Sequence, residues 1–225
     1  YGKDTWSKTT GYHHNLGYFF NFSHNIFSYH HRFDEEHESY KIGFIQPLTD
    51  SFTLRGNHAT GYKNKTTWGA LEFSDSQEIS LDYNNFTTTL FKTDVDSLNT
   101  DGIEMSYGTD NFRIFASHLN SKTGDVVSLR RPDWNLGLMH SLDLDNKWSM
   151  TTNYKFKAEH LDVHNSNWST ISMPDTHLLD LTFSRSLYGI DLGFTVTNVL
   201  DEDYESPHGF EQDGRRINLG FNRSF

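Results

Sequence analysis

Apolar and polar residues alternate with a period of two along most of the chain, and helical spacing is almost absent. Such alternation places apolar side chains on one face of a β-strand and polar side chains on the other. It is clearest near the C-terminus, where Ile217, Leu219 and Phe221 alternate with polar residues and glycine. The pattern predicts about thirteen strands, many near the roughly 9–11 residues that a tilted strand needs to cross a bilayer. The expected strands cover residues 16–22, 27–33, 40–44, 52–54, 79–83, 86–93, 103–107, 112–119, 134–142, 148–156, 179–183, 190–196 and 217–225.

Two kinds of connection separate these strands, and they follow one another in strict alternation. Short turns rich in Asn, Asp, Gly and Pro fall around residues 23–25, 47–50, 83–85, 108–111, 143–146 and 187–189. Longer polar connections span residues 33–39, 58–76, 94–101, 120–131, 158–174 and 201–215. An outer-membrane β-barrel has short periplasmic turns and longer extracellular loops, whereas the connections of a soluble β-sandwich obey no such rule. The connections therefore favour an all-β, antiparallel transmembrane β-barrel.

Composition excludes several classes of protein. The 19 Lys and Arg against 30 Asp and Glu, a formal charge of -11, argue against a general nucleic-acid binder, which needs a basic surface. The absence of cysteine excludes disulfides and thiolate metal sites, and no apolar run approaches the roughly 18 residues of a membrane helix. Aromatic residues make up 15% of the chain, which suits the aromatic girdles of a membrane barrel but also a soluble sandwich.

The polar face and the two ends of the chain agree with a barrel wall. Lys155, Lys157 and Asp180 fall on polar faces, which we expect to point inward, to water or to a plug. Phe225 ends an alternating strand. Arg223 interrupts the apolar stripe of that strand, but it lies near the chain end and so near a membrane interface, where a lipid-facing Arg costs about 0–1 kcal/mol. The chain starts at Tyr1 without a signal peptide, so we expect an N-terminal part of the protein outside it.

The most specific stretch of sequence runs from Phe194 to Glu205, followed by Gly209-Phe210 and Gly214-Arg215-Arg216. It resembles the end of TonB-dependent outer-membrane receptors, where "V-x-N-L-F-D-x-x-Y", a Gly-aromatic pair and "G-R" precede a last strand ending in Phe. Asn198 and Tyr204 match the Asn and Tyr of that motif. Further stretches that resemble the family, in the same order, are residues 29–34 with 40–43, 59–63, 100–104 and 129–132. The cobalamin receptors are the most similar subgroup.

The resemblance implies that residues 1–225 form the C-terminal part of a barrel of about 22 strands, a class whose lumen is plugged. The plug domain and the segment that contacts TonB would lie in the missing N-terminal part. The family imports a scarce small molecule, such as cobalamin or a ferric siderophore, across the outer membrane, energised by TonB. Lipopolysaccharide and other outer-membrane lipids would surround the barrel. One departure leaves the ligand open, because residues 64–76 lack the Pro-containing segment of the family and only Glu78 matches its Glu.

Ligand contacts are expected from aromatic side chains in the long connections, because loops on a rigid scaffold are where binding residues concentrate. The candidates are Tyr62, Trp68, Trp168, Tyr204 and Phe210. Packing between neighbouring loops, or onto the membrane interface, is the alternative role for each of them.

Thirteen histidines raise the question of a metal or haem site. The pairs His13–His14 and His30–His31 cannot each hold one ion if their segments are extended, because adjacent residues of a strand point to opposite faces. We therefore expect no metal site and no cofactor. The acidic residues within 34–38 could bind Ca²⁺, but a solvated loop or a divalent-bridged contact with lipopolysaccharide is the preferred interpretation.

Catalysis has little support, since the chain contains no G-x-S-x-G, H-E-x-x-H or G-x-G-x-x-G motif, and we do not expect an enzyme. Two functions remain as alternatives to the receptor: a passive outer-membrane channel of the porin kind, and a soluble β-rich binding module. A plug domain and a TonB-contacting segment upstream would distinguish the receptor from the channel.

Overall fold

The computed structural model describes residues 2–3, 12–22, 25–33, 38–64, 71–144 and 147–223. It divides into two compact units. The first comprises Tyr1–Ile103 with Asn120–Val126, and the second comprises Glu104–Leu119 with Val127–Phe225. The division passes through strands β8 (Leu98–Gly108) and β9 (Phe112–Thr123).

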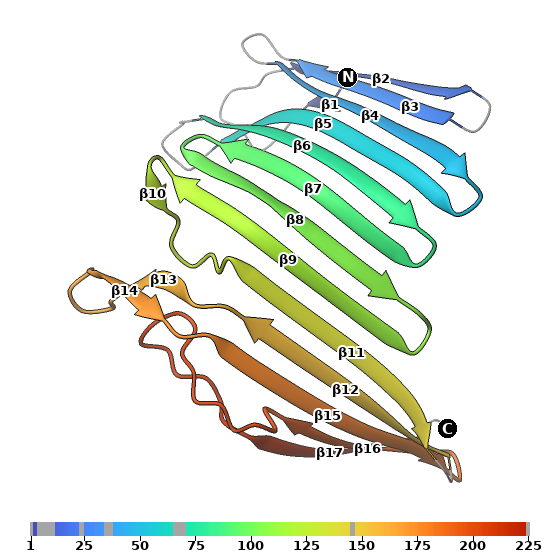
Figure 1. The fold of residues 1–225 in the computed structure, drawn as a ribbon, viewed down its shortest axis with the longest axis vertical. Coiled ribbons are helices and arrows are strands. Elements are labelled where there is room, and N and C mark those ends of the chain that lie inside the picture. The colour runs from blue at the N-terminus through green and yellow to red at the C-terminus, as the bar shows by residue number, and fades with distance from the viewer. Residues whose placement is uncertain are drawn as a thin grey trace. The chain divides into compact units, whose positions relative to one another are not determined.

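The first unit is an antiparallel sheet in which strands pair in chain order (Figure 1). Before β8 its strands are β1 (Gly2–Lys3), β2 (Tyr12–Phe22), β3 (Asn25–Phe33), β4 (Glu38–Thr49), β5 (Phe52–Asn64), β6 (Leu71–Tyr83) and β7 (Phe86–Val95). The longest pairing joins β5 to β6, from Phe52 opposite Tyr83 to Asn64 opposite Leu71. Each strand lies beside its predecessor in the chain, so tight turns are enough to connect the strands at one end.

The second unit is also an antiparallel sheet, in the order β9-β11-β12-β15-β16-β17 (Figure 1). Its strands after β9 are β11 (Trp134–Leu144), β12 (Trp148–Lys157), β15 (Thr176–Leu187), β16 (Ile190–Thr197) and β17 (Arg216–Arg223). A separate hairpin of β13 (His160–Val163) and β14 (Thr170–Met173) is inserted between β12 and β15. The two-residue strand β10 (Val126–Val127) pairs with β9.

The expectation of an all-β, antiparallel fold with about thirteen strands is confirmed. Among the described residues, thirteen strands are eight or more residues long. In the same residues, no helix is long and apolar enough to cross a membrane.

The apolar side chains of the strands are exposed rather than packed into a core. Met173 is the one buried hydrophobic residue within the described ranges. Ile42, Ile79 and Leu90 are each about half exposed, on what we call the apolar face of the first unit. A soluble sandwich buries such residues between two sheets. The absence of a buried apolar layer in these ranges argues against the soluble module.

The opposite face of each sheet, the polar face, carries hydrogen bonds between neighbouring strands. In the first unit, Arg55 donates to both carboxylate oxygens of Asp82 at 2.6 and 2.8 Å, and Ser80 and Thr89 hydrogen-bond at 2.9 Å. In the second unit the register sets Asn153 opposite Asp180, so Lys155, Lys157 and Asp180 share one face as predicted. A face of this kind is suited to water or to a polar partner.

The predicted strict alternation of short and long connections is wrong at one place, and another long connection is shorter than predicted. Strands β7 and β8 are joined by Asp96 and Ser97 alone, not by a long connection over 94–101. Strands β5 and β6 remain paired to Asn64 and Leu71, so most of the expected connection 58–76 is strand. These strand ends carry polar residues on both faces, and the period-two signal disappears there although the backbone pairing continues.

Candidate ligand-binding loops

Three connections of the second unit meet at the same end of its sheet. They are residues 127–133 before β11, residues 158–175 containing the β13–β14 hairpin, and residues 198–215 between β16 and β17. The register explains their proximity, because it sets Asn135 opposite Lys157, Lys157 opposite Thr176, and Thr197 opposite Arg216. We refer to these three segments together as the loop cluster.

Asp162, on strand β13, lies at the centre of the loop cluster. Its side chain is only 1% exposed. One carboxylate oxygen accepts hydrogen bonds from Nε of Arg130 at 2.6 Å and from the amide of Val163 at 2.7 Å. The other accepts from the amide of His208 at 2.9 Å. Asp162 therefore ties together one residue from each of the three connections.

The protonation of Asp162 follows from these contacts. Burial alone would raise the pKa of its carboxyl group, but the hydrogen bonds from the His208 amide, Arg130 and the Val163 amide favour the charged form. Together they lower the pKa from 3.8 to about 2. Asp162 is thus a buried anion at neutral pH, and its hydrogen-bond donors are required to keep it buried.

The final connection packs directly on the β13–β14 hairpin. Glu205 accepts hydrogen bonds from the Gly209 amide and from Nδ1 of His208, both at 2.7 Å, and the Gly209 amide makes the largest contribution to lowering its pKa. Gly209 has φ of 82°, and a Cβ atom at this position would lie 2.2 Å from Nδ2 of Asn165. Glycine is therefore required there by both the backbone conformation and the close approach. The centroids of the His164 and His208 rings lie 4.8 Å apart.

Asn198 stabilises the start of the final connection, directly after strand β16, through hydrogen bonds. It is 5% exposed, its amide donates to Asp180 at 2.9 Å, and its side chain both donates to the carbonyl of Glu202 and accepts from the amide of that residue. Further along, Asp201 accepts a hydrogen bond from the Arg215 amide at 2.8 Å. Asn198, Asp201 and Arg215 belong to the closing motif of the sequence, and in the structure they close this loop on itself.

The structure places the five predicted ligand-contacting residues in different settings. Trp168, at the turn of the hairpin, is 80% exposed with φ of 61°, and Phe210, in the final connection, is 63% exposed. Tyr204 is half-buried in the same connection, and burial raises the pKa of its hydroxyl, with Asp180 and Asp213 adding to the effect. Tyr62 lies in strand β5 rather than in a loop. Trp68 lies outside the described residues, as do Asp34, Glu35, Glu36 and Phe225.

Sequence reasoning did not single out Asp162 or His208. The only local signal was an acidic residue between Leu161 and Val163 in an otherwise polar connection, which does not reveal burial. Arg130 was noted for its motif, but its partner lies 32 residues away. Among the described ranges, no three His, Asp or Glu side chains are grouped so that they could hold a metal ion.

Antiparallel sheets that are apolar on one face and polar on the other, with packed loops at one end, are the architecture of an outer-membrane β-barrel. Solved structures with this fold include the FrpB iron transporter of Neisseria meningitidis (F3-3 variant), with 12% sequence identity and a TM-score of 0.77. They also include the FpvA receptor of Pseudomonas aeruginosa bound to pyoverdine (16%, 0.72) and the ferric-catecholate import receptor Fiu of E. coli K12 (11%, 0.70).

These likenesses cover 95%, 95% and 89% of this chain, but only 45%, 42% and 41% of the three solved chains. The chain thus spans less than half the length of the receptors it resembles, and at such low identity the likeness establishes the fold. No family model and no curated protein sequence matches the chain. The fold expected from the closing motif is nevertheless confirmed, while the narrower likeness to cobalamin receptors is not.

Proposed function

We propose that this chain is the C-terminal barrel portion of an outer-membrane receptor that imports a scarce small molecule. The main support for the proposal is the loop cluster, in which three connections are joined by hydrogen bonds to the buried carboxylate of Asp162. A rigid cluster that exposes Trp168 and Phe210 is a suitable surface for capturing a ligand. Among the described residues of the loop cluster we find no catalytic constellation, and we propose a receptor rather than an enzyme.

Aromatic residues near both ends of the strands support a position in the outer membrane. In the second unit, Tyr107 and Phe112 lie 6.4 Å apart near a short turn, and the guanidinium of Arg185 lies 5.6 Å from the ring of Trp148 near another. Toward the loop cluster, Trp134 stacks on His118 at 4.5 Å. Amphipathic rings prefer the two interfaces of a bilayer, where one end of the ring is apolar and the other hydrated.

The proposed ligand class is a ferric complex of the siderophore kind, ahead of cobalamin. The three solved structures named above are an iron transporter, a pyoverdine receptor and a ferric-catecholate receptor. We further propose that import depends on TonB and on a plug domain contributed by the rest of the protein. A passive channel is the alternative, and it would transport its solute without TonB.

Uptake by cells that produce the full-length protein tests the proposal. We expect TonB-dependent uptake of one radiolabelled ferric complex from a panel of catecholate and pyoverdine-type siderophores. Because truncating an aromatic anchor weakens binding, Trp168→Ala with Phe210→Ala should reduce the affinity at least about tenfold while the barrel remains in the outer membrane. Uptake that persists without TonB would favour the passive channel. If the cells take up cyanocobalamin and none of the ferric complexes, the ligand is cobalamin and the proposed ferric ligand is wrong.

A further inference from the structure

Arg130 has hydrogen-bond donors that the loop cluster does not use. Its guanidinium binds Asp162 through Nε at 2.6 Å, and neither Nη nitrogen has a hydrogen-bond partner among the described residues. The side chain is 58% exposed. The backbone is held in place, because the Arg130 amide donates to the carbonyl of Leu161 at 2.6 Å. The N–H groups of both Nη nitrogens are therefore positioned and available to a ligand.

A second cation, Lys157, lies near the same carboxylate. Lys157 ends strand β12 on the polar face, and Asp162 attracts its ammonium group electrostatically without forming an ion pair with it. Lys157 also acts on His160, which precedes Asp162 by two residues on one face of β13. Burial lowers the pKa of His160, and the charge of Lys157 lowers it further, so His160 is neutral at neutral pH. We call Arg130 and Lys157 the basic site.

The basic site carries more positive charge than its surroundings neutralise. Its two side chains are cations at neutral pH, and the buried carboxylate of Asp162 supplies a single negative charge. Glu159 accepts a hydrogen bond from Ser172, which belongs to the other face of the β13–β14 hairpin. Asp175 is paired with His177 at 3.2 Å. A net positive charge thus remains at this point of a chain whose formal charge is -11.

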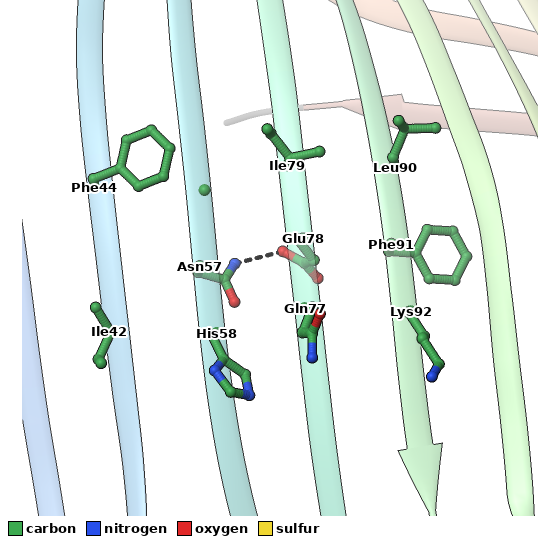
Figure 2. A pocket seen from close by; sticks show the side chains of 11 residues that line it. Ile42, Phe44, Asn57, His58, Gln77, Glu78, Ile79, Leu90, Phe91 and Lys92 are labelled. Carbon is green, nitrogen blue, oxygen red and sulfur yellow. Dashed lines mark hydrogen bonds between the residues drawn. The ribbon is translucent and has the colours of Figure 1, made fainter.

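Lys92 and His58 of the first unit differ from the basic site, because carboxylates pair with both of them. They line a cavity of about 600 Å³ on the apolar face, where Figure 2 shows their side chains on neighbouring strands. Lys92 lies 3.3 Å from Asp94, and Nε2 of His58 lies 3.0 Å from Asp75. An anionic ligand gains little from groups that are already paired, so the basic site is the better place for one.

The basic site lies where the loop cluster meets the polar face of the sheet. Arg130 belongs to the connection before β11, and Lys157 is the last residue of β12 before the connection that contains the hairpin. In a barrel wall the polar face points to the lumen. A ligand that leaves the loops for the lumen therefore passes these two cations.

We propose that the basic site binds a negatively charged ferric complex of the catecholate kind. A planar guanidinium with free N–H groups binds two neighbouring oxygen atoms, and each catecholate group presents such a pair. Catecholate groups leave the ferric complex with a net negative charge, whereas a complex of hydroxamate groups is neutral. Arg130 donates to the paired oxygens, and Lys157 balances the charge. The inference rests on the proposed function and specifies the class of its ligand.

Equilibrium binding of radiolabelled ferric complexes to the full-length protein in outer-membrane vesicles tests the proposal. The probes are ferric enterobactin, in which catecholates bind the iron, and ferrichrome, a neutral hydroxamate complex. We expect the wild type to bind ferric enterobactin at least about tenfold more tightly than ferrichrome. This affinity should fall as salt is raised, and less steeply in Lys157→Gln.

Two substitutions separate the parts of the basic site. Lys157→Gln should weaken the binding of ferric enterobactin at least about fivefold, since a hydrogen bond to a charged group contributes that factor or more. Arg130→Lys keeps the charge and one donor for Asp162 but loses the planar pair of Nη groups, and it should weaken the same binding. Lys147→Gln is the matched control, because it removes the same charge from an exposed residue before the other end of β12.

Unchanged binding of ferric enterobactin in Lys157→Gln, or an equal loss in Lys147→Gln, would overturn the proposal. Equal affinity of the wild type for ferrichrome would overturn the anionic ligand. If Arg130→Lys does not fold, Lys157→Gln decides, since the Lys157 ammonium has no ion pair in the described ranges. TonB-dependent uptake of ferrichrome without ferric enterobactin would remove this ligand class and leave the receptor standing. The absence of any TonB-dependent uptake would instead overturn the proposed function.

Discussion

Asp162 is the most completely buried of the large side chains in the described ranges, and it is an acid. Such a residue is stable only while its hydrogen-bond donors remain in place. Here the donors come from residues 130, 163 and 208, so the integrity of the loop cluster depends on one carboxylate.

Replacing Asp162 by Asn should loosen the loop cluster without unfolding the sheet. The variant loses the charge and one acceptor oxygen, and hydrogen bonds to a charged group contribute about 1.5–3 kcal/mol each. We expect the amides of Val163 and His208 to exchange hydrogen roughly tenfold faster or more. Asp175→Asn is the control, because the Asp175 side chain is 58% exposed. Equal protection in both variants would show that Asp162 does not hold the loops.

Acid should loosen the same loops through Asp162. The pKa is lowered from 3.8 to about 2 on folding, so the stabilisation is fully present above about pH 4 and is lost as the pH falls toward 2. After discounting for the exposure of Arg130, the effect is on the order of 1–2 kcal/mol. Pepsin should cleave within residues 198–215 more readily at pH 2 than at pH 4 in the wild type. Asp162→Asn, which lacks the titration, corrects for the pH profile of pepsin and should show no further change.

Motif residues could be recognised in the sequence, but their roles could not. Asn198, Asp201 and Arg215 were identified from the closing motif, and the structure shows that they close the final connection. Trp168 and Phe210 were chosen because they are aromatic and lie in loops, and they are exposed there. Tyr62 was assigned to a loop for the same reason but lies in a strand.

Strands were predictable where one face is apolar and the other polar, and their ends were not. Along β16 and β17 the alternation is regular, interrupted only at Arg223, and the predicted and observed strands agree closely. Along β5, β6 and β7 the observed strands extend beyond the predicted ones, into segments where polar residues occur on both faces and apolar residues such as Tyr62, Leu71 and Phe73 are few. The backbone hydrogen bonds continue there, but the contrast in hydropathy between the two faces is too irregular to predict the strand.

One close contact between strands gives a test of sheet packing. A Cβ atom on Gly137 of β11 would lie 2.1 Å from Cε1 of Phe115 on β9, so Gly137→Ala must displace that ring. We expect a loss of about 1–3 kcal/mol in stability, seen as a lower temperature at which the folded gel band disappears. Gly220→Ala on β17 is the control, because no atom lies within 4 Å of its added Cβ. If both variants melt alike, the ring does not occupy that position.

The orientation of the protein in the membrane follows if the loop cluster is extracellular. The 225 residues contain no cysteine, so a cysteine introduced among them is the only one in this part of the protein, and the unsubstituted protein gives the background labelling. Ser166→Cys, in the hairpin, should react with a membrane-impermeant maleimide on intact cells. Asp110→Cys, in the β8–β9 turn, should react only after permeabilisation. Labelling of both sites on intact cells, or the reverse order, would contradict the proposed orientation.

The order of apolar and polar residues was sufficient to predict an antiparallel, all-β sheet, because the alternation within each strand reflects the different surroundings of its two faces. The pairing of strands joined by short turns, such as β15 with β16, follows from the same local pattern. The burial of Asp162 required the folded chain. Its donors on Arg130 and His208 are 32 and 46 residues away, and no local pattern specifies which distant segments will meet. The contact of the Phe44 ring with Gly56 likewise exists only because the register sets Phe44, Gly56, Ile79 and Leu90 of four strands opposite one another.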